Sequence, residues 1–484
     1  MRVLLVYWNP SRELVVAPPI GLAYVATATR QAGHEVDFLD LVGSERPLED
    51  LRERLAASAP DVVGISIRNI DNVVRQRTVW HLEGAGRLAA VVRESCGARI
   101  VLGGPAVSIL GAGVLGHVDG DFAVVGEGEA VFPRLLSAIE SGRPATEIPG
   151  VCARVGDAIR TTEPARLPHF GASGLEEWID WRAYGHMGAT WPIQSKRGCP
   201  LACSYCAYPL VEGRAARLRS PADVADEIER VQARLRPRAF EFVDSTFNVP
   251  PQHAEAVCGE ILRRRLRVPL TAMGINPLGA SERLFALMRR AGFNSMMITP
   301  EAASERMLRS LCKGFGVEEI RTTARLARAS GITSMWFFMV GGPGETRETV
   351  DETVSFVERY LDGPNCVSIF TTGVRVLPGT ALARDAVREG AIAADRDLAR
   401  PTFYLSPQVD EEWVLGRINQ AMRRCRGIVH AAEEGMSTYE RVMDRALAMA
   451  GVAPPYWRFL PLLLRVPPVP VLRRRRPPLG RSGP

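Results

Sequence analysis

The chain has no long uninterrupted apolar segment, and its cysteines follow no regular spacing. None of its 484 residues lies in a run that approaches the ~18 apolar residues of a membrane-spanning helix. The first apolar stretch is broken at Pro10, which is too early for a secretory signal peptide. Nine cysteines without a framework argue against a disulfide-stabilised secreted scaffold. These absences predict a cytoplasmic protein in a reducing compartment.

The chain also lacks the basic face that a nucleic-acid-binding protein would need. Its net charge is +6, but residues 455–484 alone carry seven arginines and no acidic residue. Without this segment the rest of the chain is close to neutral, so we expect no nucleic-acid partner. The content of 46% hydrophobic and 24% charged residues is ordinary for a globular protein, and the length suggests two or three domains.

Three cysteines stand close together in the segment Cys199-Pro-Leu-Ala-Cys203-Ser-Tyr-Cys206. Closely spaced thiolates can converge on one soft metal centre, and runs of this kind hold iron–sulfur clusters. A zinc site would need a fourth Cys or His at short spacing, but the next cysteine is the distant Cys258 and no His follows within ten residues of Cys206. The spacing therefore predicts a [4Fe-4S] cluster that keeps one iron open for another ligand.

This C-x3-C-x2-C spacing, with an aromatic residue before the last cysteine, resembles the radical S-adenosylmethionine (SAM) enzymes. The resemblance implies that Cys199, Cys203 and Cys206 hold the cluster and that its open iron chelates SAM. Many relatives have Gly-x-Glu-Ser-Gly where this chain has Pro-Glu-Ala-Ala-Ser at 300–304, so this segment departs from the pattern. The SAM contacts that the resemblance implies are Tyr205, Asp244, Ser245, Glu301, Gly341, Gly342, Pro343 and Glu345.

The first 145 residues alternate between expected strands and helices. Such alternation predicts a doubly wound parallel sheet that binds its ligand at the carboxyl ends of the strands. A nicotinamide site would show G-x-G-x-x-G after the first strand, but this chain has Trp8-Asn-Pro-Ser there. Strands are expected at 3–6, 36–40, 61–66, 99–102 and 122–125, and helices at 20–33 and 48–59.

Residues 1–140 resemble the cobalamin-binding domain that precedes many radical SAM domains. The carrying segments are Pro18-Pro-Ile-Gly-Leu-Ala23, Gly33-His-Glu-Val36, Val63-Gly-Ile-Ser66, Gly103-Gly-Pro105 and Gly126-Glu-Gly-Glu129. Glycines at such strand ends let a large flat ligand approach the backbone. The cobalamin contacts that the resemblance implies are Asn9, Pro19, Ser66, Arg68, Asn69, Gly103, Gly104, Gly126, Glu127 and Gly128.

One motif of many cobalamin proteins is missing. D-x-H-x-x-G, whose His ligates cobalt from below, does not occur in this chain. The loop at residues 66–72 is the best candidate to cover the lower face instead. A cation there, such as Arg68, would not coordinate cobalt and would favour the methyl-accepting Co(I) state. Arg68 could equally pair with Asp71 or cap a helix, and the sequence leaves both roles open.

The rest of the chain is expected to form four further parts. Residues 146–186 are interpreted as a linker with a hairpin that turns at Gly156-Asp157. Residues 187–383 resume the alternation, with strands at 240–244, 270–274, 295–299, 334–340 and 367–371 after the cysteine-bearing strand, which implies a partial (β/α)6 barrel of the radical SAM type. Residues 384–454 are expected to form a mainly helical cap over the barrel mouth.

Residues 455–484 form a basic, proline-rich tail with two interpretations. Its aromatic, leucine and arginine side chains could anchor it on anionic lipid, as a weak peripheral membrane contact. Alternatively, its apolar part folds back on the body of the protein. The prolines deny the segment a continuous amphipathic helix, which favours the second interpretation.

The six cysteines outside the motif, at positions 96, 152, 258, 312, 366 and 425, are predicted to be buried thiols. Only two of them precede the motif, so a second cluster of the methylthiotransferase kind is not expected.

Taken together, the resemblances imply a cobalamin-dependent radical SAM C-methyltransferase that acts on an unactivated carbon of a small molecule or natural product. In that family the reduced cluster cleaves SAM to a 5′-deoxyadenosyl radical, the substrate radical takes a methyl group from methylcobalamin, and a second SAM remethylates cobalt. An external flavodoxin- or ferredoxin-like electron donor is implied. Two alternatives remain: a relative that uses both cofactors for ring formation or rearrangement, and a non-catalytic cobalamin- or cluster-binding carrier or sensor.

Overall fold

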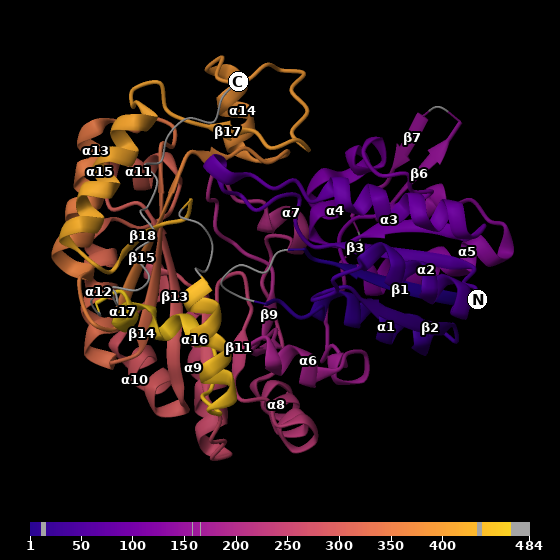
Figure 1. Cartoon of the computed structure of the whole chain (residues 1–484), viewed down its shortest axis with the longest axis horizontal. Helices are drawn as coiled ribbons and strands as arrows, with labels where there is room; N and C mark the ends of the chain where they lie inside the picture. The colour runs from indigo at the N-terminus through magenta and orange to yellow at the C-terminus, as the bar shows by residue number, and fades with distance from the viewer. Residues whose placement is uncertain (11–15, 157, 165, 433–437, 466–484) are drawn as a thin grey trace.

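The protein consists of two α/β halves, coloured indigo to purple and magenta to yellow in Figure 1. The computed structural model describes residues 1–10, 16–156, 158–164, 166–432 and 438–465. Among these residues each half contains one seven-stranded sheet, the first ending at Thr161 and the second running from Trp191 to His430. This mixed α/β architecture confirms the fold class that the alternation of strands and helices predicts.

The first sheet starts with parallel strands, as a doubly wound fold requires. Every residue of the third strand is buried, because helices cover both of its faces. The chain crosses over the first strand to pass from the second to the third, and ligands of such sheets bind where the order reverses. The order across the sheet is β2 (Glu35–Asp40), β1 (Arg2–Trp8), β3 (Val62–Ile67), β4 (Arg99–Gly103), β5 (Phe122–Val124), followed by two antiparallel strands.

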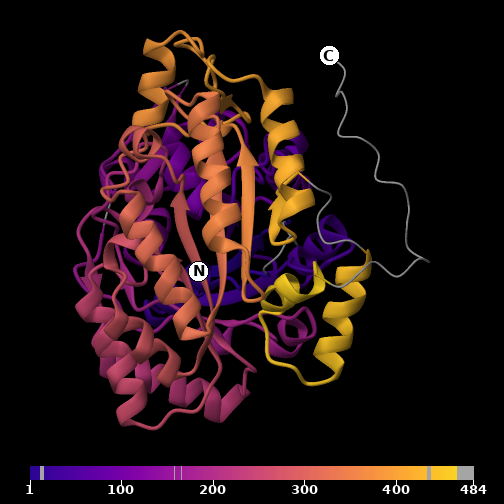
Figure 2. The ribbon, with the colours of Figure 1, turned by 90° about the vertical axis from the view of Figure 1, so that its left-hand side faces the viewer.

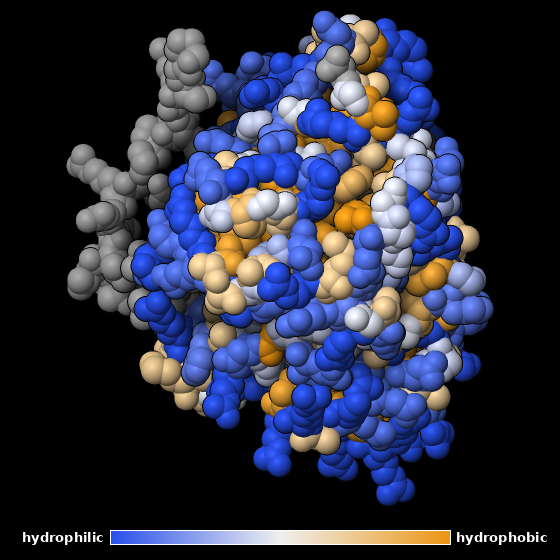
Figure 3. Space-filling view, turned by 90° about the vertical axis from the view of Figure 1, so that its right-hand side faces the viewer, coloured by the Kyte–Doolittle hydropathy of each residue, from blue (hydrophilic) through white to orange (hydrophobic). Residues whose placement is uncertain are grey.

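Helices pack on both faces of this sheet. Successive residues of β1 face different cores, with Leu4 in the core beneath one set of helices and Leu5 in the core beneath the other. The outer surface of this half is mostly hydrophilic, with apolar side chains gathered near the middle of the face (Figure 3). The helices over the core of Leu4 are α2 (Pro47–Ser58), α3 (Leu82–Ser95) and α4 (Pro105–Leu110). The helices over the core of Leu5 are α1 (Ile20–Gln31) and α5 (Gly128–Ser141).

The predicted hairpin forms, but it belongs to the first sheet. Its strands are β6 (Val151–Val155) and β7 (Ala158–Thr161), and β6 pairs antiparallel with β5. Val151, Cys152 and Ala153 are buried against the sheet, which explains why the hairpin docks there. The sheet therefore continues past residue 145, where the sequence suggested the start of a linker.

The second sheet is wholly parallel and follows the order of the chain, so it curves into an open barrel, seen from its convex side in Figure 2. Its edge strands do not pair with each other. The strands are β8 (Trp191–Ile193), β11 (Phe240–Phe242), β12 (Leu270–Ile275), β13 (Phe293–Glu301), β14 (Thr333–Val340), β15 (Cys366–Thr372) and β18 (Ile428–His430). The helices outside it are α8 (Pro221–Leu235), α9 (Pro251–Arg263), α10 (Glu282–Ala291), α12 (Val317–Ser330), α13 (Arg347–Phe356) and α15 (Glu411–Arg424).

The last strand and helix of this barrel come from the segment that was predicted to be a cap. Val414, Ile418 and Ala421 form the buried face of α15, which packs against β15 and β18. The barrel therefore has a seventh strand beyond the expected six, and this part of the mainly helical residues 384–454 belongs to the barrel. The shorter elements are α6 (Trp181–His186), β9 (Lys196–Arg197), α7 (Tyr208–Glu212), β10 (Arg217–Leu218), α11 (Glu305–Ser310), β16 (Val374–Arg375), α14 (Ala381–Arg388), β17 (Phe403–Tyr404), α16 (Thr438–Met449) and α17 (Leu460–Leu463).

Residues 456–464, which we call the plug, fill the amino-terminal end of the barrel. Trp457 and Leu460 are 5% and 8% exposed, and they share a core with inward-facing residues such as Met335 and Ile369. Trp336, between two inward residues of β14, belongs instead to the core beneath the outer helices. The apolar part of the tail thus folds back on the body, as the second interpretation expected. Residues 473–476 lie outside the described residues, and the described helices all fall short of what a bilayer crossing requires.

The loop after β3 ties the two halves together. Asp71 Oδ2 accepts a hydrogen bond from Arg375 Nε at 2.6 Å, and their side chains are 1% and 4% exposed. Nearby, Arg75 pairs with Glu411 at 3.1 Å, and Trp80 Nε1 donates to the carbonyl of Ala399 at 2.9 Å. This loop also carries Arg68, so the second half helps to fix its position.

Candidate active site

The three motif cysteines lie in a loop after β8 and β9, at the carboxyl-terminal end of the barrel. Cys199 is buried, and Cys203 and Cys206 are half-buried. The loop is held by its backbone: Cys199 N donates to Gly213 O at 3.0 Å, and Ser204 N donates to Leu311 O at 3.0 Å. The loop is thus anchored on both sides by backbone hydrogen bonds.

Gly198, immediately before the first cysteine, cannot be replaced without strain. Its φ is +89°, and a Cβ there would lie 2.0 Å from the carbonyl oxygen of Ala215. The close approach of the segments around Gly198 and Ala215 fixes the direction in which the cysteine loop leaves the sheet.

The three motif thiols belong to one short loop, and burial affects the pKa values of two of them. Among the described residues, no three His, Cys, Asp or Glu side chains are placed to hold one ion. A cluster spaces its thiolates more widely, because each binds a different iron atom. Burial raises the pKa of Cys206 to about 12 and also raises that of Cys203, and the neighbouring motif thiols add to both shifts. The three groups therefore lie close enough to sense one another.

Tyr205 and Glu301, both predicted to contact SAM, meet around a lysine that the sequence analysis did not single out. Lys313, only 2% exposed, donates from Nζ to Tyr205 Oη at 3.0 Å and to Thr299 O at 3.1 Å. Burial raises the pKa of Glu301, and the Lys313 charge opposes that rise. Glu301 has a φ of +68°, a strained conformation that is typical of functional sites. The sequence signal for Lys313 is its place in a loop shortly after Glu301.

Asp244 and Ser245 follow β11 beside the cysteine loop. Asp244 is 2% exposed and accepts hydrogen bonds from Ser195 N at 2.8 Å, Ser195 Oγ at 2.6 Å and Lys196 N at 3.1 Å. The carboxylate therefore braces the segment that leads into the motif. The hydroxyl of Ser245 is buried and has no hydrogen-bond partner among the described residues, so it has capacity left for a ligand.

The glycine-rich turn follows β14, where the sequence places it. Glu345 is turned inward: its Oε2 accepts from Gly341 N at 3.1 Å, and its other oxygen accepts from Thr349. Burial raises the pKa of Glu345 to about 7. Ser310 Oγ donates to Pro343 O at 2.6 Å, which joins the turn to the segment that holds Lys313. The side chain of Glu345 therefore fixes the shape of the turn. The backbone of Gly341 and Gly342 lies next to the segment that anchors the cysteine loop.

A cavity of about 340 Å³ lies between the carboxyl ends of the first sheet's strands and the second half. Gly104 has a φ of +97°, and a Cβ there would lie 2.6 Å from the carbonyl oxygen of Ile67, so this tight cradle requires glycine. A large flat ligand such as cobalamin suits this backbone-lined surface. The predicted cobalamin contacts that line it are Pro19, Ser66, Arg68, Gly103, Gly104, Gly126, Glu127 and Gly128.

Two predicted cobalamin contacts, Asn9 and Asn69, are not among the residues that line this cavity. Asn9 is 4% exposed and lies at the end of β1, and the side chain of Asn69 turns to Arg68. Glu127 lines the cavity, but its carboxylate also pairs with Arg197 at 3.5 Å and Arg217 at 2.5 Å in the second half. The glycine-rich loop after β5 therefore joins the halves directly beside the cysteine motif.

The opposite wall of the cavity belongs to the barrel half, and the sequence analysis missed it. It includes Glu241 and Met273 from the inner face of the barrel. An acidic residue between two buried phenylalanines in β11 is the signal that could have revealed Glu241. The other polar residues of this wall are Thr190, Gln194, Arg197, Tyr208 and Glu212.

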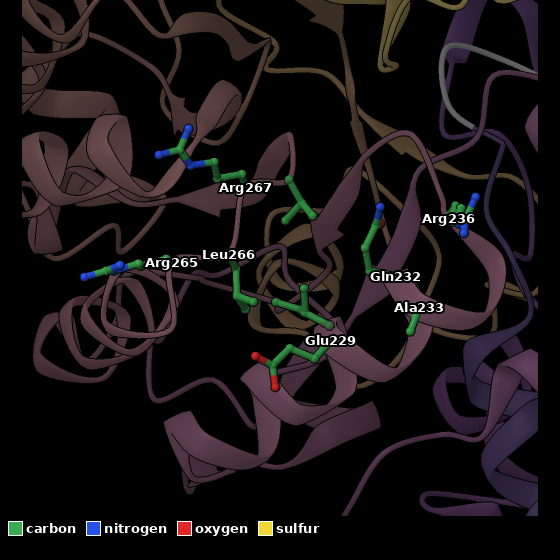
Figure 4. A pocket seen from close by; sticks show the side chains of 9 residues that line it. Glu229, Gln232, Ala233, Arg236, Arg265, Leu266 and Arg267 are labelled. Carbon is green, nitrogen blue, oxygen red and sulfur yellow. The ribbon is translucent and has the colours of Figure 1, made fainter.

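A second hollow, of about 420 Å³, lies apart from this site (Figure 4). It is formed by the carboxyl end of α8 and the segment just before β12. These segments meet at the amino-terminal end of the barrel strands, whereas the motif cysteines lie at the opposite end. Its three arginines, Arg236, Arg265 and Arg267, are thus remote from the candidate chemistry.

Two family models match the chain, one in each half. The B12 binding domain matches residues 14–136, and the Radical SAM superfamily matches residues 193–357. The chain is 25% identical over 378 residues to an uncharacterized methyltransferase of Pyrococcus horikoshii, covering 74% of this chain and 78% of that protein. It is 26% identical over 444 residues to the tryptophan 2-C-methyltransferase of Streptomyces laurentii, covering 78% and 73%. It is 27% identical over 376 residues to the anaerobic magnesium-protoporphyrin IX monomethyl ester cyclase of Rubrivivax gelatinosus, covering 73% and 65%.

Among solved structures, the chain is similar to the radical S-adenosylmethionine methyltransferase TsrM from Kitasatospora setae, determined with its tryptophan substrate and a SAM analogue. The TM-score is 0.82, the identity is 22%, and the match covers 96% of this chain and 99% of that chain. The two proteins share the whole arrangement of both halves.

Proposed function

We infer that this chain, which belongs to the cobalamin-dependent radical SAM enzymes, is a C-methyltransferase that acts on a small molecule. A B12 binding domain precedes a radical SAM domain, and relatives that match most of the chain include methyltransferases. One observation carries the proposal: a single cavity is lined by the strand ends of the first half and by the inner wall of the barrel. Such a cavity lets a cofactor bound to one half face the reaction chamber of the other.

In this proposal each cofactor has its own part of the site. Cys199, Cys203 and Cys206 hold the [4Fe-4S] cluster, and SAM lies between the cysteine loop, Glu301 and the glycine-rich turn. Cobalamin occupies the cavity at the strand ends. When bound, SAM and the cluster supply a 5′-deoxyadenosyl radical, and cobalamin supplies the methyl group. The protein orients these groups, and the plug closes the far end of the barrel to water.

The partners follow from the same arrangement. The substrate would enter from the carboxyl-terminal side of the barrel, because the plug fills the other end. An external flavodoxin- or ferredoxin-like donor would reduce the cluster near its loop. A peripheral membrane contact through the tail would depend mainly on residues 466–484, since Trp457, Leu460 and Leu464 of the plug pack inside the barrel.

Anaerobic incubation of the reconstituted enzyme with SAM labelled in its methyl group and with candidate metabolites tests the function. We expect 5′-deoxyadenosine, S-adenosylhomocysteine and a product that carries the label, because each turnover consumes one SAM as radical source and one as methyl donor. A new product without the label, formed with 5′-deoxyadenosine, would favour the cyclase reaction of the relative in Rubrivivax gelatinosus. If neither 5′-deoxyadenosine nor a labelled product forms under any condition, the result would contradict an enzyme and favour a carrier or sensor.

We further propose that Arg68 covers the lower face of cobalt. It lines the cavity, whereas Asp71, its other candidate partner, is paired with Arg375. The Co(II) form should therefore show no nitrogen splitting from the lower ligand in its electron paramagnetic resonance spectrum. Arg68→His should introduce a three-line splitting, because its imidazole nitrogen could then reach cobalt. Splitting in the wild type, or none in Arg68→His, would refute this placement.

A further inference from the structure

One carboxylate on the barrel side of the cavity has an oxygen without a donor. Glu241 is 3% exposed, and its Oε2 accepts a hydrogen bond from Thr190 Oγ1 at 2.5 Å. Its Oε1 is buried, and no donor among the described residues reaches it. Glu241 also lines the cavity. Leaving a buried carboxylate oxygen without a donor is unfavourable, so this atom marks a place where a bound molecule can complete the site.

The strand explains why this acid faces inward. Its neighbours Phe240 and Phe242 pack in the core beneath the outer helices, so alternation directs Glu241 into the barrel. In register beside it stand Pro192 on β8 and Thr271 on β12, neither of which carries a charge. Burial raises the pKa of Glu241, and the charge of Arg68, across the cavity, opposes that rise. The two register neighbours of Glu241 therefore offer its carboxylate no cation.

We propose that Glu241 Oε1 accepts a hydrogen bond from a primary-amide N–H on the rim of the corrin ring, so that the barrel half sets the orientation of cobalamin. This inference rests on the proposed function. Cobalamin carries neutral amides around its ring, and these are the donors that a buried carboxylate oxygen lacks. The first half lines the cavity with glycines and apolar side chains, together with polar groups such as Ser66, Arg68 and Glu127. A hydrogen bond from the barrel wall would fix the ring relative to the reaction chamber.

The test measures the dissociation constant of hydroxocobalamin for the full-length chain with a reconstituted cluster. Glu241→Leu should weaken binding about 10- to 100-fold, as expected for the loss of a hydrogen bond to a charged acceptor. Glu241→Gln keeps the size and an acceptor oxygen, so it should retain most of the affinity. Thr271→Val is the matched control, because Thr271 is the register neighbour of Glu241 and is not among the cavity-lining residues; it should bind like the wild type.

A structural role alone would give a different pattern. Removing a buried carboxylate that has one oxygen without a donor should leave thermal stability without cobalamin unchanged or higher, while cobalamin binding falls. If Glu241→Leu binds hydroxocobalamin as tightly as the wild type, the inference is wrong. If the wild type itself does not bind hydroxocobalamin, the proposed function fails, and the two failures are therefore distinguishable.

Cobalamin derivatives in which one ring amide is hydrolysed to an acid identify the donor. One of these monocarboxylates should bind the wild type more weakly than cobalamin does, because its carboxylate meets that of Glu241. The same derivative should lose this penalty with Glu241→Gln. If no derivative distinguishes the two proteins, the donor is not a corrin amide, and the proposal is refuted in favour of a donor on the substrate.

Discussion

Cys203→Ala is expected to abolish both the cluster and the cleavage of SAM. The three motif cysteines lie in one anchored loop, and no other cysteine was predicted to take part. With two thiolates left, a four-iron cluster would lose one of its three protein ligands. Iron and sulfide per chain, and the visible absorbance after anaerobic reconstitution, should fall to near zero, and 5′-deoxyadenosine should fall to background.

Cys96→Ser is the matched control for this variant. Cys96 is half-buried at the end of α3 in the first half, where its thiol faces Val92 O at 3.6 Å. Its replacement should leave the iron content and SAM cleavage unchanged. A full cluster in Cys203→Ala would overturn the assignment of the motif, whereas loss of the cluster in both variants would indicate a general folding defect.

Arg375→Met is expected to destabilise the protein by about 3–5 kcal/mol, because it leaves the Asp71 carboxylate buried without its cation. Arg375 also donates to Leu398 O at 3.0 Å, so its removal frees a second buried acceptor. The loop after β3 should become more mobile, and the position of Arg68, which this loop carries, should become less well defined. We expect a lower unfolding midpoint in denaturant and weaker binding of hydroxocobalamin.

Arg388→Met serves as the matched control, because Arg388 pairs with Asp385 while 73% exposed. Exposed pairs contribute at most about 1 kcal/mol, so this variant should unfold close to the wild type. The double variant Asp71→Asn with Arg375→Met should recover part of the lost stability, since the stranded charge is gone. Equal stability of the wild type and Arg375→Met would show that the two halves do not depend on this contact.

Local sequence patterns predicted most of the fold. Alternating apolar runs located β1 to β5 and the strands from β11 to β15, because each run is bounded by turn residues and followed by a helical pattern. The strand β18 (Ile428–His430) was missed, because the segment around it was predicted to be mainly helical. The amphipathic pattern of α15 was visible, but its packing partner depends on tertiary structure. Cys312, predicted to be buried, is exposed in the loop before Lys313.

The candidate site, like the fold, could be predicted from the sequence only in part. Spacing and glycine positions identified the cysteine loop and the strand ends of the first half, because these depend on neighbours in the chain. The barrel wall of the cavity was not assigned, since the place of Glu241 and Met273 in it depends on how the two halves pack together. Lys313 was missed for the same reason: its partners Tyr205 and Thr299 come from two other segments.

The plug also bears on the order in which the protein is made. Residues 456–464 are translated after every strand that they cover, so a nascent chain can form the barrel while its amino-terminal end is still open. During that interval the inward-facing Met335, Val367 and Ile369 are exposed to water and to chaperones. A chain that ends before residue 456 would keep this apolar opening permanently and become a target for aggregation or degradation. Any shortened version made for the laboratory should therefore retain residues up to 465.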